Sequence, residues 1–391
     1  MGNKIAHPTV ALGLVALSAA ALTAACAAGQ GPGRQAARTG HPAHQAAAHR
    51  PRPALSPVSA GFISASTGWL LARPPCAARG CAELRLRQTT DGGRHWLTVP
   101  APPAPFWNFT IAPGNAVSQI MFASARDGWA FGPGLWATHD GARTWHRVRV
   151  HGTAVMSMAA GGGRVIAAFG RCPENSPCRF TVYAARMGGD RWRPVPGSAV
   201  TGLSAESGLS PAPVLISGRT GFVIADQPPA RPPVLLAGPA DGSGRWHRIS
   251  VPHRICFSAP LAVAPGGRIV LGCGAEPGAG QQRKHAYLSL DQGRTWRRLA
   301  DPPSSGYLTQ ASATARGTIF LSGGRSDVYI SRNGGRTWQT SRSLRSADIG
   351  DGLAATAVTS REAFVLQASL YAKQIWFSYD DGRTWSPVTV R

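Results

Sequence analysis

Aspartates recur at one position of an eight-residue pattern, and regularly placed carboxylates are groups that could perform acid–base chemistry or bind a metal ion. The clearest copy is SYDDGRTW at 378–385, and four further copies align with it. Their acceptor residues are Asp91, Asp140, Asp291, Asn333 and Asp380. Because neighbouring copies are spaced for separate repeat units, these side chains should be dispersed and form no catalytic or metal site. The amide at Asn333 indicates that the position needs an acceptor oxygen, as in a turn, and not a charge.

Each copy closes with a tryptophan, which is expected to bury its ring against a neighbouring repeat. The aligned tryptophans are Trp96, Trp145, Trp296, Trp338 and Trp385, and two degenerate copies of the motif end at Trp192 and Trp246. The spacing of about 48 residues marks a repeat architecture. Each repeat reads as four short strands separated by turn signals, and no stretch has the apolar spacing of a long helix. The pattern predicts an all-β, seven-bladed β-propeller of four-stranded blades over residues 58–391, each blade built from contiguous sequence.

The second repeat combines F-x-x-x-x-x-G-W with T-x-D-G-x-x-x-W. The residues that carry this combination are Phe122, Gly128, Trp129, Thr138, Asp140 and Trp145. It resembles the Asp-box (bacterial neuraminidase) repeat and is similar to repeats of photosystem II assembly/stability factor-like propellers. The resemblance implies that each Asp box is the turn between the third and fourth strands of a blade. It predicts the fold and leaves the function open, since Asp boxes occur in glycosidases, receptors and assembly factors.

The N-terminal segment reads as an export signal followed by a tether. Residues 1–25 combine an early Lys4 with an apolar run and small residues, and Cys26 follows in a relaxed lipobox. We expect Cys26 to be lipidated and to anchor the chain to the outer face of a bacterial cytoplasmic membrane; an ordinary cleaved signal is the alternative. Residues 26–57 contain mostly Ala, Gly, Pro, Gln, Arg and His, a composition that predicts a disordered linker.

Six cysteines remain in the exported part, in three close pairs. The expected disulfides are Cys76 with Cys81, Cys172 with Cys178, and Cys256 with Cys273. Six cysteines allow fifteen connectivities, so the pairing rests on their nearness in sequence and on an oxidising compartment. The spacings, with no nearby histidine ligands, do not match a closed zinc site.

The loops between second and third strands and the crossings between blades are long and varied, and are predicted to form the binding face. The candidate contact residues on this face are Arg73, Arg79, Phe106, Trp107, Arg171, Arg179, Arg231, Arg283, Lys284 and Arg325. A solvated surface is the alternative for the charged residues, and packing under their own loop is the alternative for the two aromatic residues. The chain has 41 Lys and Arg against 18 Asp and Glu, a charge of +23 that is compatible with anionic partners.

The function predicted from the sequence is that of a membrane-tethered binding or scaffold propeller, monomeric and without a cofactor, that recognises a protein or an anionic envelope polymer. No nucleic-acid partner is expected, because export separates the chain from it and basic and aromatic residues are not interleaved. The alternative is an exo-glycosidase of the sialidase type, which uses a Tyr nucleophile and a carboxylate. The nearest match to the early sialidase segment Phe-Arg-Ile-Pro is HRIC at 253–256, which lacks both the Phe and the Pro.

Overall fold

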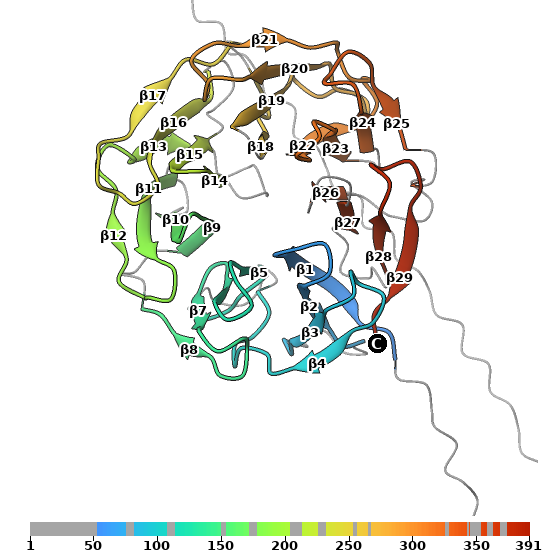
Figure 1. Cartoon of the computed structure of the whole chain (residues 1–391). Helices are drawn as coiled ribbons and strands as arrows, with labels where there is room; N and C mark the ends of the chain where they lie inside the picture. The colour runs from blue at the N-terminus through green and yellow to red at the C-terminus, as the bar shows by residue number, and fades with distance from the viewer. Residues whose placement is uncertain are drawn as a thin grey trace, which may run out of the picture. The chain divides into compact units, whose positions relative to one another are not determined.

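Short antiparallel strands make up the regular secondary structure of the described residues in the computed structural model (Figure 1). The structure describes residues 53–75, 82–107, 114–149, 154–171, 178–203, 213–225, 232–252, 256–264, 267–324, 328–341, 344, 353–357, 363–367 and 374–391. Within these ranges, no helix has the length and apolar character needed to cross a membrane.

The strands form sheets in chain order. The first sheet contains β1 (Ser56–Phe62), β2 (Gly68–Arg73), β3 (Arg85–Thr89) and β4 (Leu97–Val99). The second contains β5 (Gln119–Phe122), β6 (Gly128–Phe131), β7 (Leu135–Thr138) and β8 (His146–Arg147). The third contains β9 (Ala154–Gly161), β10 (Arg164–Arg171), β11 (Cys178–Arg186), β12 (Arg193–Pro194) and β13 (Val200–Leu203).

The C-terminal half continues in the same way. The next sheets contain β14 (Val214–Ser217), β15 (Thr220–Ala225), β16 (Val234–Pro239) and β17 (His247–Ile249), then β18 (Leu261–Ala264), β19 (Arg268–Gly274), β20 (Lys284–Ser289) and β21 (Arg297–Arg298). The last two contain β22 (Tyr307–Ala313), β23 (Ile319–Gly324), β24 (Val328–Ser331) and β25 (Gln339–Thr340), then β26 (Leu353–Ala357), β27 (Ala363–Gln367), β28 (Gln374–Ser378) and β29 (Ser386–Thr389).

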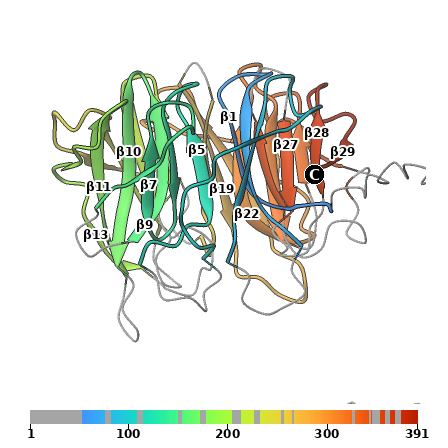
Figure 2. The ribbon, with the colours of Figure 1, turned by 90° about the horizontal axis from the view of Figure 1, so that it is seen from below.

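The sheets are arranged around a ring, with the first strand of each sheet toward the centre and the fourth at the rim (Figure 1). Seen from the side, the strands run along the axis of the ring (Figure 2). Each sheet comes from one contiguous stretch of chain, as the sequence predicted. The fold of residues 51–391 is therefore an all-β propeller with four-stranded blades.

One detail of the predicted architecture is corrected. Six sheets have four strands, but the sheet that begins with β9 has five, because β13 also pairs with β11. The physical reason is the length of β11, which spans nine residues, whereas β12 has only two. The chain covers the part of β11 that β12 leaves unpaired by returning as β13, whose Val200 pairs with Phe180.

Burial rises toward the middle of each blade, as expected for sheets that are covered on both faces by their neighbours. All four residues of β6 are buried, whereas both residues of β8 at the rim are exposed. The glycine of the Gly-Trp pair has a packing role, since a Cβ at Gly128 would lie 2.5 Å from the ring of Phe122. The missing side chain lets Phe122 lie in the interface between blades, where it stacks on Trp69 with ring centroids 3.8 Å apart.

The ring closes between the last and first sheets without exchange of a strand. Leu55 donates a backbone hydrogen bond of 2.8 Å to the carbonyl of Val390, and both residues are buried in one apolar cluster with Phe377. The first strand begins at Ser56, before the predicted boundary, and includes Pro57. Proline is tolerated there because β1 is an inner edge strand, and the pairing with β2 is irregular between Pro57 and Ser59.

Candidate functional site

The Asp-box side chains stabilise turns. Asp291 Oδ1 accepts hydrogen bonds from the Thr295 amide (2.8 Å) and the Ser289 hydroxyl (2.8 Å), and its Oδ2 accepts one from the Thr295 hydroxyl (2.6 Å). These bonds, that of the Thr295 hydroxyl first, lower the pKa of Asp291 to about 2. Asn333 Oδ1 accepts the Thr337 amide at 3.0 Å in the same way, which explains why an amide can replace the acid. The carboxylates therefore act as turn acceptors and are occupied.

The closing tryptophans join blades through their indole N–H groups as well as through their rings. The indole nitrogens of Trp145, Trp296 and Trp338 donate to carbonyls at the end of the preceding blade, at 2.9, 3.0 and 2.7 Å. The expected burial of the rings holds for Trp385 and Trp246. The rings of Trp96, Trp145, Trp192, Trp296 and Trp338 are only half-buried. Their position near the rim, beside short and exposed fourth strands, is the reason.

One of the expected disulfides lies among the described residues. Cys256 and Cys273 are bonded, with 5.1 Å between their Cα atoms, and both are buried. Cys178 is also disulfide-bonded. Its expected partner Cys172 lies outside the described residues, as do Cys76 and Cys81.

The structure overturns the prediction that Lys284 lies on a binding face. Its side chain is only 1% exposed, and Nζ donates to the carbonyls of Gln282, Pro303, Ser305 and Gly306 at 2.8–3.1 Å. Nζ also lies 5.0 Å from the centre of the Tyr329 ring. This ammonium fastens the crossing between two blades, because backbone oxygens on both sides of the crossing accept its hydrogen bonds.

The predicted aromatic contact patch is also corrected. Phe106 is buried, and the guanidinium of Arg73 lies 4.6 Å from the centre of its ring. Trp107 is half-buried, and its amide donates to the carbonyl of Val117 at 3.0 Å. Phe106 thus packs in the core beneath its crossing, and the ring of Trp107 is partly covered. Of the other predicted contact residues, Arg171, Arg179 and Arg283 are exposed, and Arg79, Arg231 and Arg325 lie outside the described residues.

A second surface emerges on the opposite side of the ring. In an up-and-down blade, the turn between strands one and two lies beside the Asp-box turn, and backbone hydrogen bonds join the two, as from Gly92 to Ser66 and from Gly141 to Arg126. Turns of neighbouring blades also touch, as where the Tyr379 hydroxyl donates to the Gly92 carbonyl at 2.8 Å. We call this surface, made of the Asp-box turns and the first hairpin turns, the turn face.

Arginines recur on the turn face. Each Asp-box turn, including the two degenerate copies, contributes one exposed arginine. These are Arg94, Arg143, Arg191, Arg245, Arg294, Arg336 and Arg383. The first hairpin turns add Arg126, Arg164, Arg219, Arg268 and Arg316. The aspartates of the same turns are Asp91, Asp127, Asp140, Asp190, Asp241, Asp291, Asp380 and Asp381. The four box aspartates among them accept hydrogen bonds within their own turns but keep their negative charge. With twelve arginines against eight aspartates, the formal charge of these turns is positive.

The sequence prediction missed this surface although the signal was available. The arginine occupies a fixed place in each copy of the motif, just before Thr-Trp or its equivalent. The sequence pattern assigns the whole motif to turn formation. The structure shows that the residues of the motif have different roles. The aspartate accepts hydrogen bonds inside the turn, whereas the arginine side chain is exposed.

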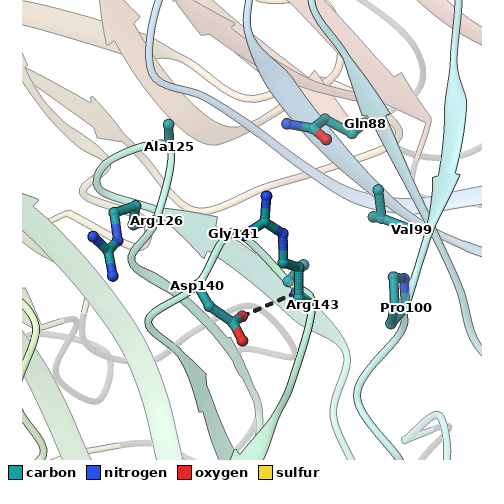
Figure 3. A pocket seen from close by; sticks show the side chains of 9 residues that line it. Gln88, Val99, Pro100, Ala125, Arg126, Asp140, Gly141 and Arg143 are labelled. Atoms are coloured by element: carbon teal, nitrogen blue, oxygen red, sulfur yellow. Dashed lines mark hydrogen bonds between the residues drawn. The ribbon is translucent and has the colours of Figure 1, made fainter.

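A pocket of about 530 Å³ lies on the turn face between the first two sheets (Figure 3). Its polar lining includes Gln88, Arg126, Asp140 and Arg143, and in this view the two arginines lie on either side of the aspartate. Asp140 is held by Thr144, whose hydroxyl donates at 2.6 Å, and this bond is the first cause of its lowered pKa. The pocket thus offers two guanidinium groups to an anionic group and contains one carboxylate, which is already engaged.

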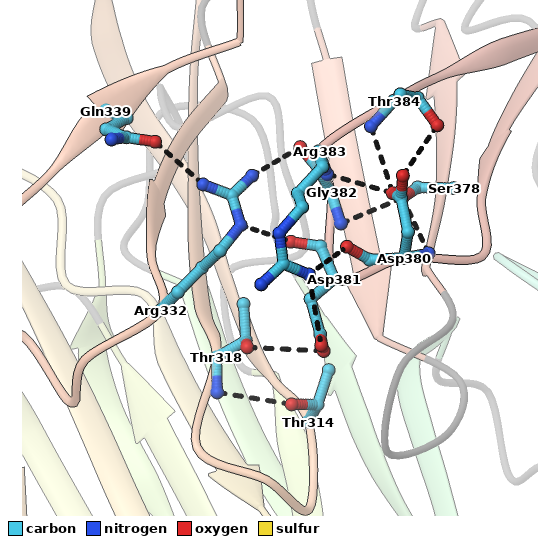
Figure 4. A network of polar contacts seen from close by, with 10 residues as sticks. All are labelled: Thr314, Thr318, Arg332, Gln339, Ser378, Asp380, Asp381, Gly382, Arg383 and Thr384. Atoms are coloured by element: carbon cyan, nitrogen blue, oxygen red, sulfur yellow. Dashed lines mark hydrogen bonds and ion pairs between the residues drawn. The ribbon is translucent and has the colours of Figure 1, made fainter.

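Polar contacts link the turns of neighbouring blades on the turn face. Arg332 Nε donates to the carbonyl of Asp381 at 2.8 Å, and one Nη donates to that of Gly382 at 2.6 Å (Figure 4). The other Nη donates to the Gln339 side chain at 2.8 Å. Arg332, the second residue of the sixth Asp box, therefore ties the turns of the last two blades together.

Comparison with known proteins supports the fold. No family model matches the chain, and no curated protein matches its sequence. Among solved structures, YCF48 bound to D1 peptide is 17% identical, with a TM-score of 0.52 and coverage of 87% of this chain and 95% of that one. YCF48 from Cyanidioschyzon merolae is 15% identical, with a TM-score of 0.50 and coverage of 84% and 96%. A GH93 α-L-arabinofuranosidase of Fusarium graminearum with arabinobiose, 14% identical, covers 87% and 94% with a TM-score of only 0.40. The chain thus has a propeller fold that resembles that of YCF48.

Proposed function

We propose that this chain is an exported, membrane-anchored propeller that binds an acidic segment of a partner protein on the turn face. The observation that carries the proposal is the repetition of an exposed arginine at every Asp-box turn. Guanidinium groups bind carboxylates with paired hydrogen bonds. Because they project from a set of linked turns, little order has to be imposed on the protein when a partner binds.

The similarity to YCF48 is consistent with a protein partner. One of the two YCF48 structures holds a peptide, and the similarity to this chain covers 95% of the YCF48 chain. We extend to this chain the general mode, recognition of a protein segment by a propeller, and leave the identity of the segment to experiment.

The glycosidase alternative receives less support. Glycoside hydrolysis uses an acid together with a base or a nucleophile on either side of the scissile bond. In the turn-face pocket the lining carboxylate is Asp140, which accepts hydrogen bonds from Thr144 and Arg143 and has a lowered pKa. Such a group is a poor proton donor at neutral pH. Turnover of a fluorogenic sialoside by the purified protein would favour the enzyme instead.

The anchor is part of the same proposal. Lipidation of Cys26 would hold the chain at the membrane, and the linker between Cys26 and the first strand would let the turn face reach a partner. The Cys256–Cys273 disulfide supports an oxidising compartment. Replacement of Cys26 with Ala should move the protein from the membrane fraction to the soluble fraction; unchanged membrane association would refute lipid anchoring.

The binding surface can be tested with charge-reversal variants. The double variant Arg126→Glu/Arg143→Glu changes the pocket, whereas Arg179→Glu/Arg283→Glu makes the same change of charge on the opposite face. Both pairs are exposed in the structure. With a fluorescent oligoglutamate peptide as the probe, we expect the pocket variant to weaken binding about tenfold or more and the control to have little effect.

The outcomes separate the possible partners. Binding should weaken as salt is added, because exposed charges are screened over about 8–10 Å at physiological ionic strength. Equal losses in the two variants would place the effect in the overall charge rather than in the turn face. Tighter binding of inorganic polyphosphate than of the peptide, lost in the same variant, would overturn the protein partner in favour of an anionic polymer.

A further inference from the structure

Two histidines and an aspartate converge between the second and third sheets, beside the turn face. His139 belongs to the second Asp box, His146 to β8, and Asp190 to the turn between β11 and β12. Asp190 Oδ2 lies 3.4 Å from His139 Nε2 and 2.5 Å from His146 Nε2. One ligand atom from each of the three side chains lies within 4.8 Å of the others, although 51 and 44 residues separate the histidines from Asp190 in sequence.

A fourth side chain sets the tautomer of His139. Asp127 Oδ1 lies 2.9 Å from His139 Nδ1, and Asp127 Oδ2 accepts the hydroxyl of Ser124 at 2.8 Å. An ionised carboxylate can only accept hydrogen bonds, so His139 Nδ1 must carry the hydrogen. In the neutral ring, Nε2 then presents a lone pair toward Asp190. A carboxylate behind a histidine is the usual arrangement around a metal-binding imidazole.

With a neutral ring, the contact between His139 and Asp190 therefore has no hydrogen-bond donor, and either a metal ion or a proton on Nε2 would complete it. With a neutral ring, two acceptors face one another at 3.4 Å, a separation longer than most N–H···O hydrogen bonds. Two ligands of a tetrahedral zinc ion with bonds of 2.0–2.1 Å are about 3.3 Å apart, which matches this separation. The 2.5 Å between His146 Nε2 and Asp190 Oδ2 is a direct hydrogen bond, and this distance must lengthen when an ion binds. In addition, Asp190 Oδ1 is buried and accepts no hydrogen bond from the described residues. This unpartnered oxygen is a second observation that points to a missing positive ligand.

We propose that His139, His146 and Asp190 form a binding site for a zinc-class divalent cation, with Asp127 as a positioning residue. Imidazole and carboxylate ligands suit such borderline ions, whereas Ca²⁺ and Mg²⁺ prefer oxygen ligands alone. The side chain of His146 is 51% exposed, so its ring is free to move the short distance that a ligand geometry requires. Three protein ligands leave a fourth position for water or for a group of a bound partner.

The competing explanation is a proton in place of the metal. A doubly protonated His139 would donate to both Asp127 and Asp190 and hold the blades together without any ion. The two explanations differ in one measurable respect, since only the metal site binds Zn²⁺ stoichiometrically at neutral pH.

The test is a titration of the purified full chain with ZnCl₂, measured by calorimetry, with Co²⁺ visible absorption as a second readout. We expect one equivalent that is lost, or weakened at least tenfold, in His146→Gln and in Asp190→Asn. Asp127→Asn should weaken the same equivalent about 10- to 100-fold, as loss of a supporting carboxylate does. Zn²⁺ should also raise the melting temperature of the wild type and not that of His146→Gln.

Two controls address weak binding elsewhere. His95→Gln removes another exposed histidine, whose Nδ1 lies 2.6 Å from Asp91 Oδ2. Among the described residues, no third His, Cys, Asp or Glu joins this pair to form a metal site. Replacing His41, His44 and His49 with Gln removes the histidines of the linker. Both should retain the equivalent. The proposal is wrong if His146→Gln and Asp190→Asn bind Zn²⁺ as the wild type does, or if the linker variant loses the equivalent.

Discussion

Replacing Lys284 with Met tests whether this residue fastens the crossing between blades or contacts a ligand. Methionine has similar length and fills the same apolar path, but it cannot donate hydrogen bonds. The variant therefore leaves the carbonyls of Gln282, Pro303, Ser305 and Gly306 without their common donor in a buried site. The substitution separates the charge and its hydrogen bonds from the packing of the side chain.

The expected magnitude follows from these four contacts. An ammonium has three N–H groups, so its four contacts share three hydrogen bonds. At roughly 1.5–3 kcal/mol for each bond from a charged donor, their loss removes about 4.5–9 kcal/mol in gross terms. The variant also avoids the desolvation of the ammonium, which costs several kcal/mol. The net loss should be about 3–5 kcal/mol, in the range found when one partner of a buried ionic group is removed.

Urea denaturation followed by tryptophan fluorescence gives the measurement. With a slope of about 3 kcal/mol per M or more for a chain of this size, the midpoint should fall by about 1 M. Arg283→Met is the matched control, because the neighbouring side chain is exposed and should change the midpoint little. A loss below about 1 kcal/mol for Lys284→Met, or equal losses in the two variants, would refute this account of the buried ammonium.

Three further predictions concern the Asp boxes, the closing tryptophans and the disulfide. Asp291 has a folded-state pKa of about 2, below its unfolded value near 3.9, so it stabilises the fold above about pH 4 and this contribution is lost as the pH falls from about 4 to 2. Melting curves should therefore show a smaller loss of stability over this range in Asp291→Asn than in the wild type, while the other box aspartates still contribute to both. Trp385→Ala should lower the free energy of unfolding by about 3–5 kcal/mol, because the ring is buried. Trp296→Ala should lower it by about 2 kcal/mol, because that ring is half-buried. Urea denaturation measures both, and equal losses would contradict the difference in burial. Replacing both Cys256 and Cys273 with Ala should cost about 3 kcal/mol, from the loop entropy of a 17-residue separation, and an unchanged midpoint would argue against this.

The candidate surface was only partly accessible to sequence reasoning. The repeated motif contains both Asp291 and Arg294, and the sequence alone does not show which of the two is occupied within the turn. The hydrogen bonds of Asp291 resolve this and leave Arg294 as the exposed member of the pair. Loops were expected to carry the contact residues because they vary, but Phe106 and Lys284 in these segments are buried. Variability of a loop does not reveal which of its side chains are covered.

The sequence by itself determined the features that depend on local interactions. The period of about 48 residues, the Asp-box turns and the Gly-Trp pairs specify strands, turns and therefore a ring of blades, since each of these signals acts over a few residues. The tertiary structure decided what depends on contacts between blades. His139 and His146 meet Asp190, and the Lys284 ammonium meets carbonyls some 20 residues away, only because neighbouring sheets pack against one another. No local pattern encodes such meetings, because they are set by the packing of one sheet on the next.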